Sequence, residues 1–252
     1  MIKTNLFQSS DVRNITDQKG CFSVLEYEYD PSVTADAAIR AYYEAQMNVH
    51  KRQVIATLKG NGVILQAGAM QMMAGPIEAS TNVKGVGDLI GKAFSAKVTK
   101  ETAVKPRYSG NGTLVLEPTY KHILLEDVNK WPGGMVIEDE LFLACDDTIQ
   151  IKTVMRQSLS AATLGNEGLF NSALLGDGIA VLESPVPKEE LVVFDLENDV
   201  LKIDGSIAIA WSCGLQFTVE RTTKTIVGSA ASGEGLVNVY RGTGRVLVAT
   251  VR

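Results

Sequence analysis

The 252-residue sequence is poor in the side chains from which most metal and catalytic sites are built. It has two histidines, His50 and His122. Neither lies at the spacing of a zinc ligand from the other or from a cysteine, so we expect no metal site. The three cysteines, Cys21, Cys145 and Cys213, are far apart and odd in number. This pattern favours buried thiols over disulfides and fits a reducing, cytoplasmic location.

Long apolar runs and an excess of positive charge are also missing. No apolar stretch approaches the roughly 20 residues that a membrane-spanning helix needs, so no transmembrane segment is expected. Residues 1–6 lack the charged region and the apolar stretch of a secretory signal, so secretion is not indicated. The net charge of −5 argues against general nucleic-acid binding.

Catalytic and phosphate-binding motifs are absent from the sequence as well. The glycine-rich stretch Gly85–Gly91 has the spacing Gly-x-Gly-x-x-x-Gly, which differs from a P-loop and lies outside any βαβ unit. No Gly-x-Ser-x-Gly elbow accompanies the histidines. Acidic pairs such as Glu126 and Asp127 at strand ends are typical of solvated surfaces. We therefore expect no enzyme, no catalytic residue and no cofactor.

One segment, Gly85–Arg107, differs electrostatically from the rest of the chain. Residues 84–107 hold six cations and two anions, although the whole chain is acidic. An apolar stripe that includes Leu89, Ile90 and Phe94 accompanies these cations. Three interpretations stay open: the segment covers the protein's own core, contacts a subunit or another protein, or lies on a membrane surface.

What the sequence does contain is an internal repeat. Three evenly spaced Gly-x-Gly motifs each open a run of strand-forming residues, and a glutamate precedes each motif at nearly constant distance. We interpret them as copies of one supersecondary unit, and we favour a scaffold role for the glutamates over three equivalent binding sites. The residues that define the repeat are Glu101, Gly110, Gly112, Glu167, Gly176, Gly178, Glu234, Gly242 and Gly244.

Each copy has the pattern of short strands. Ile149–Val154 alternates apolar and polar residues, and turn signals recur about every ten residues, as in an all-β sandwich or barrel. The prediction is a mainly β fold with pseudo-threefold repetition, packed as one body. Residues 1–107 would hold an N-terminal strand, a helix and a degenerate first β unit. The second unit would span residues 108–175 and the third residues 176–252.

One helix is expected near the N-terminus, over about residues 33–48. Ser32 or Thr34 can cap its first turn, which is followed by good helix formers. Four apolar residues then recur at helical spacing, and we expect them to pack the helix onto the sheets. They are Ile39, Tyr42, Tyr43 and Met47.

Several glycine-containing stretches resemble the Altered Inheritance of Mitochondria family, which occurs in bacteria and, in a mitochondrial branch, in fungi. The resemblance covers roughly residues 53–252. The stretches that carry it are Ala67-Gly68-Ala69-Met70, the loop Gly85–Gly91, Glu167-Gly168-Leu169-Phe170 with Gly176-Asp177-Gly178, and Gly233-Glu234-Gly235-Leu236 with Gly242-Thr243-Gly244.

The resemblance implies β units similar to subunits of the tryptophan RNA-binding attenuation protein, of the double-stranded β-helix or sandwich type, with three fused in one chain. It further implies a homotrimer, which would form a ring of nine units. The attenuation protein binds tryptophan and RNA, but no ligand residue of its sites carries over to this sequence. The fungal member of the family is linked to inner-membrane organisation, which suggests a scaffolding role.

Two functions follow from these observations. We expect a non-enzymatic scaffold or assembly protein that self-associates as a homotrimer, because three repeated β units leave strand edges that need covering. The alternative is a small-molecule or peptide binder that uses clefts between β units or between subunits. An enzyme ranks third, since no catalytic constellation is visible in the sequence.

Overall fold

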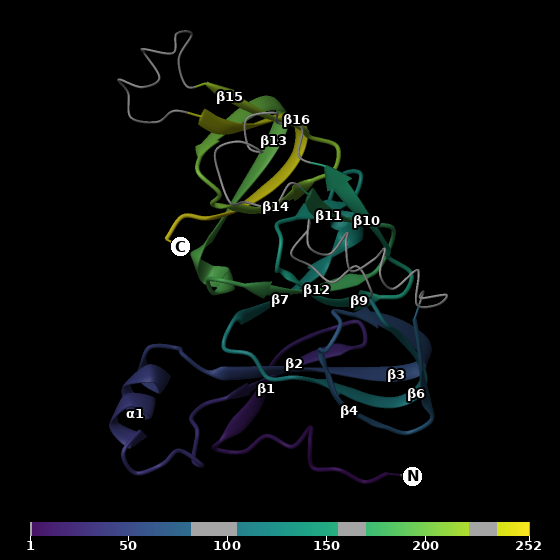
Figure 1. Ribbon diagram of the computed structural model, residues 1–252, viewed down its shortest axis with the longest axis vertical. Coiled ribbons are helices and arrows are strands. Elements are labelled where there is room, and N and C mark those ends of the chain that lie inside the picture. Colours follow the sequence, from purple (N-terminus) through teal and green to yellow (C-terminus); the bar gives the residue numbers. More distant parts are fainter. Residues whose placement is uncertain (1, 82–104, 156–169, 222–235, 252) are drawn as a thin grey trace, which may run out of the picture.

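A computed structural model describes residues 2–81, 105–155, 170–221 and 236–251 of the protein (Figure 1). Within these ranges the chain forms two antiparallel sheets and one α-helix, so the prediction of a mainly β fold is confirmed. No helix in the described ranges has the length and hydropathy needed to cross a membrane.

The first sheet has nine strands. They are β1 (Arg13–Lys19), β2 (Phe22–Tyr27), β3 (Lys51–Leu65), β4 (Met70–Ala74), β5 (Ile77–Ser80), β6 (Arg107–Leu116), β7 (His122–Asp127), β9 (Phe142–Asp146) and β12 (Ile179–Ser184). The path runs β1-β2-β3-β9-β12-β7, while β6 joins β3 and carries β4 and β5. The sheet curls until its two ends meet, since the ammonium of Lys19 on β1 donates a 3.0 Å hydrogen bond to the carbonyl of Leu125 on β7.

The second sheet has seven strands in the order β10-β11-β8-β14-β16-β13, with β15 paired to β16. They are β8 (Met135–Ile137), β10 (Gln150–Met155), β11 (Phe170–Leu175), β13 (Leu191–Asp204), β14 (Ala208–Ser212), β15 (Gln216–Arg221) and β16 (Leu236–Ala249). Two short 3-10 helices, η1 (Val128–Lys130) and η2 (Lys188–Glu190), connect strands, and α1 (Ala38–Gln46) precedes β3.

The three largest hydrophobic cores follow one another along the long axis of the molecule, where β1–β6, then β7–β12 and then β13–β16 succeed each other (Figure 1). A fourth, small cluster of Leu6, Leu25, Ile55 and Val115 lies at the first group of strands. Phe22 lies in the first core, Phe142 in the second and Trp211 in the third. The cores adjoin, because the neighbouring residues Leu124 and Leu125 on β7 point into the second and the first core respectively. Alternation along one strand therefore joins two cores.

The interval between the Gly-x-Gly motifs recurs in the strand bounds of the second and third groups. The same shift along the chain carries the bounds of β9 onto those of β14 and the bounds of β10 onto those of β15, and it also separates the first residues of β11 and β16. Strand β6 begins at Arg107 and pairs with β3, β4 and β5, so its pairing spans the predicted boundary between the first two units. The division at residues 107 and 175 and the likeness of the units to the attenuation protein stay predictions.

The first and third Gly-x-Gly motifs lie inside long strands, β6 and β16, where the strand crosses the turn between the two strands that precede it. The second motif lies between β11 and β12 and crosses the turn between β9 and β10. A Cβ atom on Gly110 in β6 would lie 2.2 Å from the carbonyl oxygen of Pro76, in the turn between β4 and β5. A Cβ atom on Gly178 would lie 2.9 Å from Oγ1 of Thr148, in the turn between β9 and β10. Glycine is therefore required by the close approach of strand and turn.

A matching hydrogen bond ties strand to turn in the second and third groups. The backbone N–H of Ile179 donates to a carboxylate oxygen of Asp146 at 2.8 Å. The backbone N–H of Arg245 donates to the hydroxyl of Ser212 at 2.9 Å. The two donors are separated by the repeat interval and so are the two acceptors, so different side chains make the same contact.

The predicted repeat glutamates and most of the basic segment fall outside the described residues. They are Glu101, Glu167, Glu234 and residues 85–104 of the segment.

Helix α1 is shorter than predicted and packs differently. It begins after Ala37 without a side-chain cap, because the hydroxyl of Ser32 donates to the carboxylate of Asp30 at 2.6 Å and takes part in a turn. The prediction that its large apolar residues pack on the sheets is wrong. Those residues point to solvent and are highly exposed: Ile39 at 75%, Tyr42 at 62%, Tyr43 at 64% and Met47 at 76%.

Because β6 crosses the turn between β4 and β5 closely, replacing a glycine by alanine should lower the free energy of unfolding more at this crossing than at a glycine with open space around it. Gly110→Ala combines a φ of +135° with the contact to Pro76, so we expect it to lower the free energy of unfolding by roughly 3 kcal/mol or more. Gly68→Ala is the matched control, with a φ of +84° but no atom within 4 Å. It should cost only about 1–2 kcal/mol. Urea unfolding followed by circular dichroism measures both, and equal costs would contradict the crossing.

The cleft beneath helix α1, a candidate functional site

A cleft of about 630 Å³ lies between α1 and the end of the first sheet. Its size is within the range of small-molecule and peptide sites. Residues from β2, β3, α1 and the segment after β6 surround it: Val12, Tyr27, Tyr29, Asp30, Pro31, Ser32, Val33, Ala37, Arg40, Ala41, Glu44, Ala45, Val49, His50, Lys51, Gln53, Gln71, Pro118 and Tyr120.

Small side chains on α1 keep the cleft open. Ala37, Ala41 and Ala45 are spaced four residues apart and therefore lie on one face of the helix, the face that lines the cleft. A methyl group reaches only a short distance, so the helix stands over the sheet without filling the space below it. The usual amphipathic arrangement is reversed here, since the large apolar residues face outward.

Two ion pairs line the cleft. The ammonium of Lys51 lies 2.5 Å from the carboxylate of Asp30. The guanidinium of Arg40 lies 2.7 Å from the carboxylate of Glu44. The hydrogen bond from Lys51, assisted by those from Ser32, lowers the pKa of Asp30 from its ordinary value to about 2. The same bond raises the pKa of Lys51. The cleft thus presents both signs of charge, each held by its partner.

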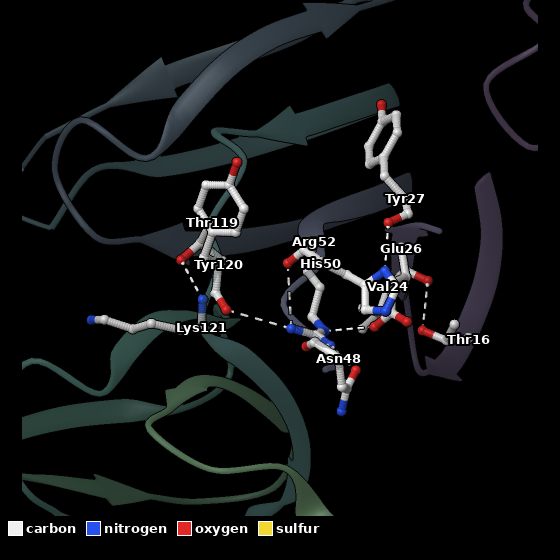
Figure 2. Close-up of polar contacts among 10 residues, drawn as sticks. All are labelled: Thr16, Val24, Glu26, Tyr27, Asn48, His50, Arg52, Thr119, Tyr120 and Lys121. Carbon is white, nitrogen blue, oxygen red and sulfur yellow. Dashed lines mark hydrogen bonds and ion pairs between the residues drawn. The ribbon is translucent and has the colours of Figure 1, made fainter. Parts of the chain in front are cut away.

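Arg52 is buried and neighbours cleft residues His50, Lys51 and Gln53 in the chain, and Figure 2 shows its polar contacts. Its Nε donates to Glu26 on the neighbouring strand β2 at 2.5 Å. Its Nη2 donates to the side-chain oxygen of Asn48 at 2.8 Å, and its Nη1 donates to the carbonyls of His50 and Tyr120 at 3.4 Å. Arg52 therefore binds β2, the connection from α1 and the segment after β6 through one side chain.

Backbone bonds reinforce the same junction. The N–H of Arg52 donates to the carbonyl of Thr119 at 2.7 Å, and the N–H of Thr119 donates back at 2.8 Å. This isolated bridge places Pro118 and Tyr120 beside the start of β3, where they line the cleft. A buried ion pair does little for net stability but holds its surroundings in one arrangement when its partners are complete. Arg52 is thus a positioning residue for the cleft walls.

Both histidines lie near Arg52, His50 directly before β3 and His122 at the start of β7. Nδ1 of His50 lies 2.9 Å from the carbonyl of Tyr27, and since a carbonyl only accepts, Nδ1 carries the hydrogen. Burial and then the charge of Arg52 lower the pKa of His122. In the described ranges no group of three histidine, cysteine or acidic side chains could hold a metal ion.

The cysteines form no disulfide. The thiol of Cys145 is buried as predicted, whereas Cys21 and Cys213 are only partly buried. Burial, with the charge of Asp146 as the second cause, raises the pKa of Cys21 to about 12. Burial also raises the pKa of Cys145 and of Cys213. All three thiols therefore stay protonated near neutral pH and are poor nucleophiles.

Of the predicted repeat residues, those that the structure describes are glycines, and none of them lines this cleft. The described glycines of the repeat lie at the crossings between strands and turns. Sequence reasoning named no cleft residue as functional, because the walls come from four separate stretches of the chain. The one available signal was the basic run His50–Arg52, which falls at the start of β3.

The Arg52 junction predicts unequal costs for two arginine substitutions. Arg52→Met leaves the half-buried carboxylate of Glu26 and several carbonyls without their donor, so the free energy of unfolding should fall by about 3–5 kcal/mol. Arg40→Met removes an exposed pair within the helix and should leave the free energy of unfolding nearly unchanged. Adding Glu26→Gln to Arg52→Met should restore part of the loss. Equal costs in urea unfolding would rule out the junction as a structural centre.

Comparison with known proteins gives a family and a related fold. The family described as mitochondrial biogenesis AIM24 matches residues 43–251. The crystal structure of protein SPYM3_0169 from Streptococcus pyogenes superposes with a TM-score of 0.59 at 24% sequence identity, covering 82% of this chain and 90% of that one. At this identity the likeness concerns the fold alone. No curated protein matches the chain.

The family match begins inside α1 and extends through β16. It confirms the resemblance seen in the glycine-containing stretches. Since it covers most of the sequence, the chain belongs to the AIM24 family of mitochondrial biogenesis proteins.

Proposed function

We propose that this protein is a non-enzymatic assembly protein that forms a homotrimer. The observation that carries the proposal is the open edge of the second sheet. Among the described strands β13 pairs with β16 alone, so a 14-residue strand leaves its outer backbone groups without a neighbouring strand. Val192, Val193, Phe194 and Val200 on this strand are 38–50% exposed. Apolar side chains on a long open edge favour association with another chain.

The arrangement of the three cores supports a trimer built from repeated units. Each core belongs mainly to one group of strands, and the second and third groups have the same spacing of strands along the chain. The proposal treats all three groups as β units of the attenuation-protein type. Three copies of the chain would then supply the nine units of a ring, with the open edges covered between copies.

A structural role also suits the chemistry of the conspicuous side chains. Three carboxylates around the cleft are held by cations: Glu26 by Arg52, Asp30 by Lys51 and Glu44 by Arg40. Paired carboxylates stay ionised and are weak general acids. The raised pKa values of the thiols oppose nucleophilic chemistry. The absence of a disulfide is compatible with the proposed cytoplasmic location.

The mass of the full chain in solution tests the assembly. We expect sedimentation and light scattering at micromolar concentration to give three times the 27.1 kDa of one chain. The trimer should persist at high salt, because apolar contacts are not screened by ions. A monomer at these concentrations, or a stable dimer, would contradict the proposal.

A second function, binding of a small molecule or a peptide, is favoured by the cleft beneath α1. The cleft combines a volume of about 630 Å³ with tyrosine rings, amides and both signs of charge, which suits a ligand with apolar and polar parts. Its position under a helix that buries no side chain of its own permits entry by a small movement of α1.

Thermal-shift measurements with free amino acids and tripeptides at millimolar concentration test this second function. A ligand at 100 times its dissociation constant adds about 2.7 kcal/mol, so the melting temperature should rise by roughly 5–10 °C. Ala41→Phe fills the cleft and should abolish the shift. Ala38→Phe, on an exposed position that does not line the cleft, is the control and should keep it. Equal shifts in both variants would place binding elsewhere.

A further inference from the structure

We propose that the outward face of α1 docks on strand β13 of a second copy of this chain, so that the copies associate head to tail. This inference rests on the proposed trimer and names the two surfaces that would form it. A ring of three identical chains cannot use one self-complementary patch, because a twofold contact closes at two copies. Each chain must therefore present two different surfaces that fit each other.

The first surface is the outward face of α1. Ile39, Tyr43 and Met47 are spaced four residues apart and form a stripe, with Tyr42 beside it. The rings of Tyr42 and Tyr43 contact each other edge to face at 5.5 Å. A solvent-exposed stripe of this size on a short helix is unusual, since most of a helix's stability in a protein comes from burying such a face. A partner that covered the stripe would supply that burial.

The second surface is the edge of β13. Val192 pairs with Val248 and Val193 pairs with Leu247, and directly opposed residues share a face of the sheet. Val248 belongs to the third core and Leu247 to the second, so the two exposed valines lie on opposite faces of the sheet. Apolar surface on both sides of one edge suits an element that lies along the edge. Helix α1 and β13 belong to the first and the last group of strands, so both surfaces occur once in each chain (Figure 1).

Charge selects between the possible pairings. Strand β13 carries four acidic residues and one lysine, a balance of −3. Its acidic residues are exposed, and one of them, Asp195, forms an ion pair with Arg245 on β16. Two β13 edges would therefore repel each other. Helix α1 carries one cation and one anion, and the guanidinium-bearing side chain of Arg40 is 83% exposed beside the apolar stripe. The contact of α1 with β13 thus joins apolar surface to apolar surface. Because Arg40 is paired with Glu44, the contact brings a helix without net charge, rather than a second acidic strand, to the acidic edge.

A complementation experiment with two variants of the full chain tests the pairing. The first variant, Ile39→Glu with Tyr43→Glu, alters only the α1 stripe. The second variant, Val193→Asp with Val200→Asp, alters only the β13 edge. Each should lose the trimer, with association weakened on the order of 100-fold or more. Mixed together, they should form a one-to-one heterodimer, because one intact α1 stripe still meets one intact β13 edge.

Two further variants test whether the effect is specific to these surfaces and whether it depends on charge. Met73→Glu changes an exposed apolar residue on β4 and should leave the trimer intact. Ile39→Lys with Tyr43→Lys should weaken association less than the glutamate version, because β13 is acidic. All substituted positions are exposed, so circular dichroism should show a folded chain for every variant.

The outcomes separate the inference from the proposed function. A wild-type monomer would overturn both. A wild-type trimer that survives the α1 substitutions would overturn only the docking of α1 and leave the trimer standing. Two monomeric variants that fail to pair on mixing would show that the two surfaces do not meet. Loss of binding to anionic phospholipid vesicles in the α1 variant, with the trimer unchanged, would assign the stripe to a lipid surface and overturn the inference.

Discussion

The close crossing of long strands over the turns before them is the constraint on which the rest of the fold depends. At Gly110 and Gly178 the backbone passes so near the turn that a methyl group would overlap it. The crossing lets one stretch of chain serve two neighbouring surfaces: β16 pairs with β15 through its first half and with β14 through its second. Strand β16 contributes buried residues to the second and the third core and so joins these two neighbouring cores.

Much of this architecture could be predicted from the sequence, since it is encoded locally. Glycine spacing and alternation of apolar residues depend on backbone conformation and on burial of one face, which are visible in single stretches. Of the three motifs that were expected to open strands, only the one at Gly176 lies at a strand boundary, between β11 and β12. Gly110 and Gly242 lie inside β6 and β16, so that expectation was wrong for these two motifs. Sheet order was not predictable, because the pairing of β3 with β9 or of β8 with β14 joins residues far apart in the chain.

The candidate site and the orientation of α1 could not be predicted from the sequence, for a related reason. Helical spacing of Ile39, Tyr43 and Met47 defines a face but not the direction in which it points. The alanines on the opposite face and the turn around Asp30 decide that direction. Arg52 shows the same limit, since a basic run at the start of a strand does not show which of its residues will be buried, here Arg52 against Glu26 and Asn48.

Helix α1 has no buried side chain. Its local stability therefore does not depend on the packing of the hydrophobic cores. Opening of such a segment exposes almost no new apolar area, so its free energy is set locally and lies far below that of global unfolding. Amide protons of α1 would exchange with solvent long before those of β3 or β16. Local opening of α1 is therefore expected to leave the two sheets folded.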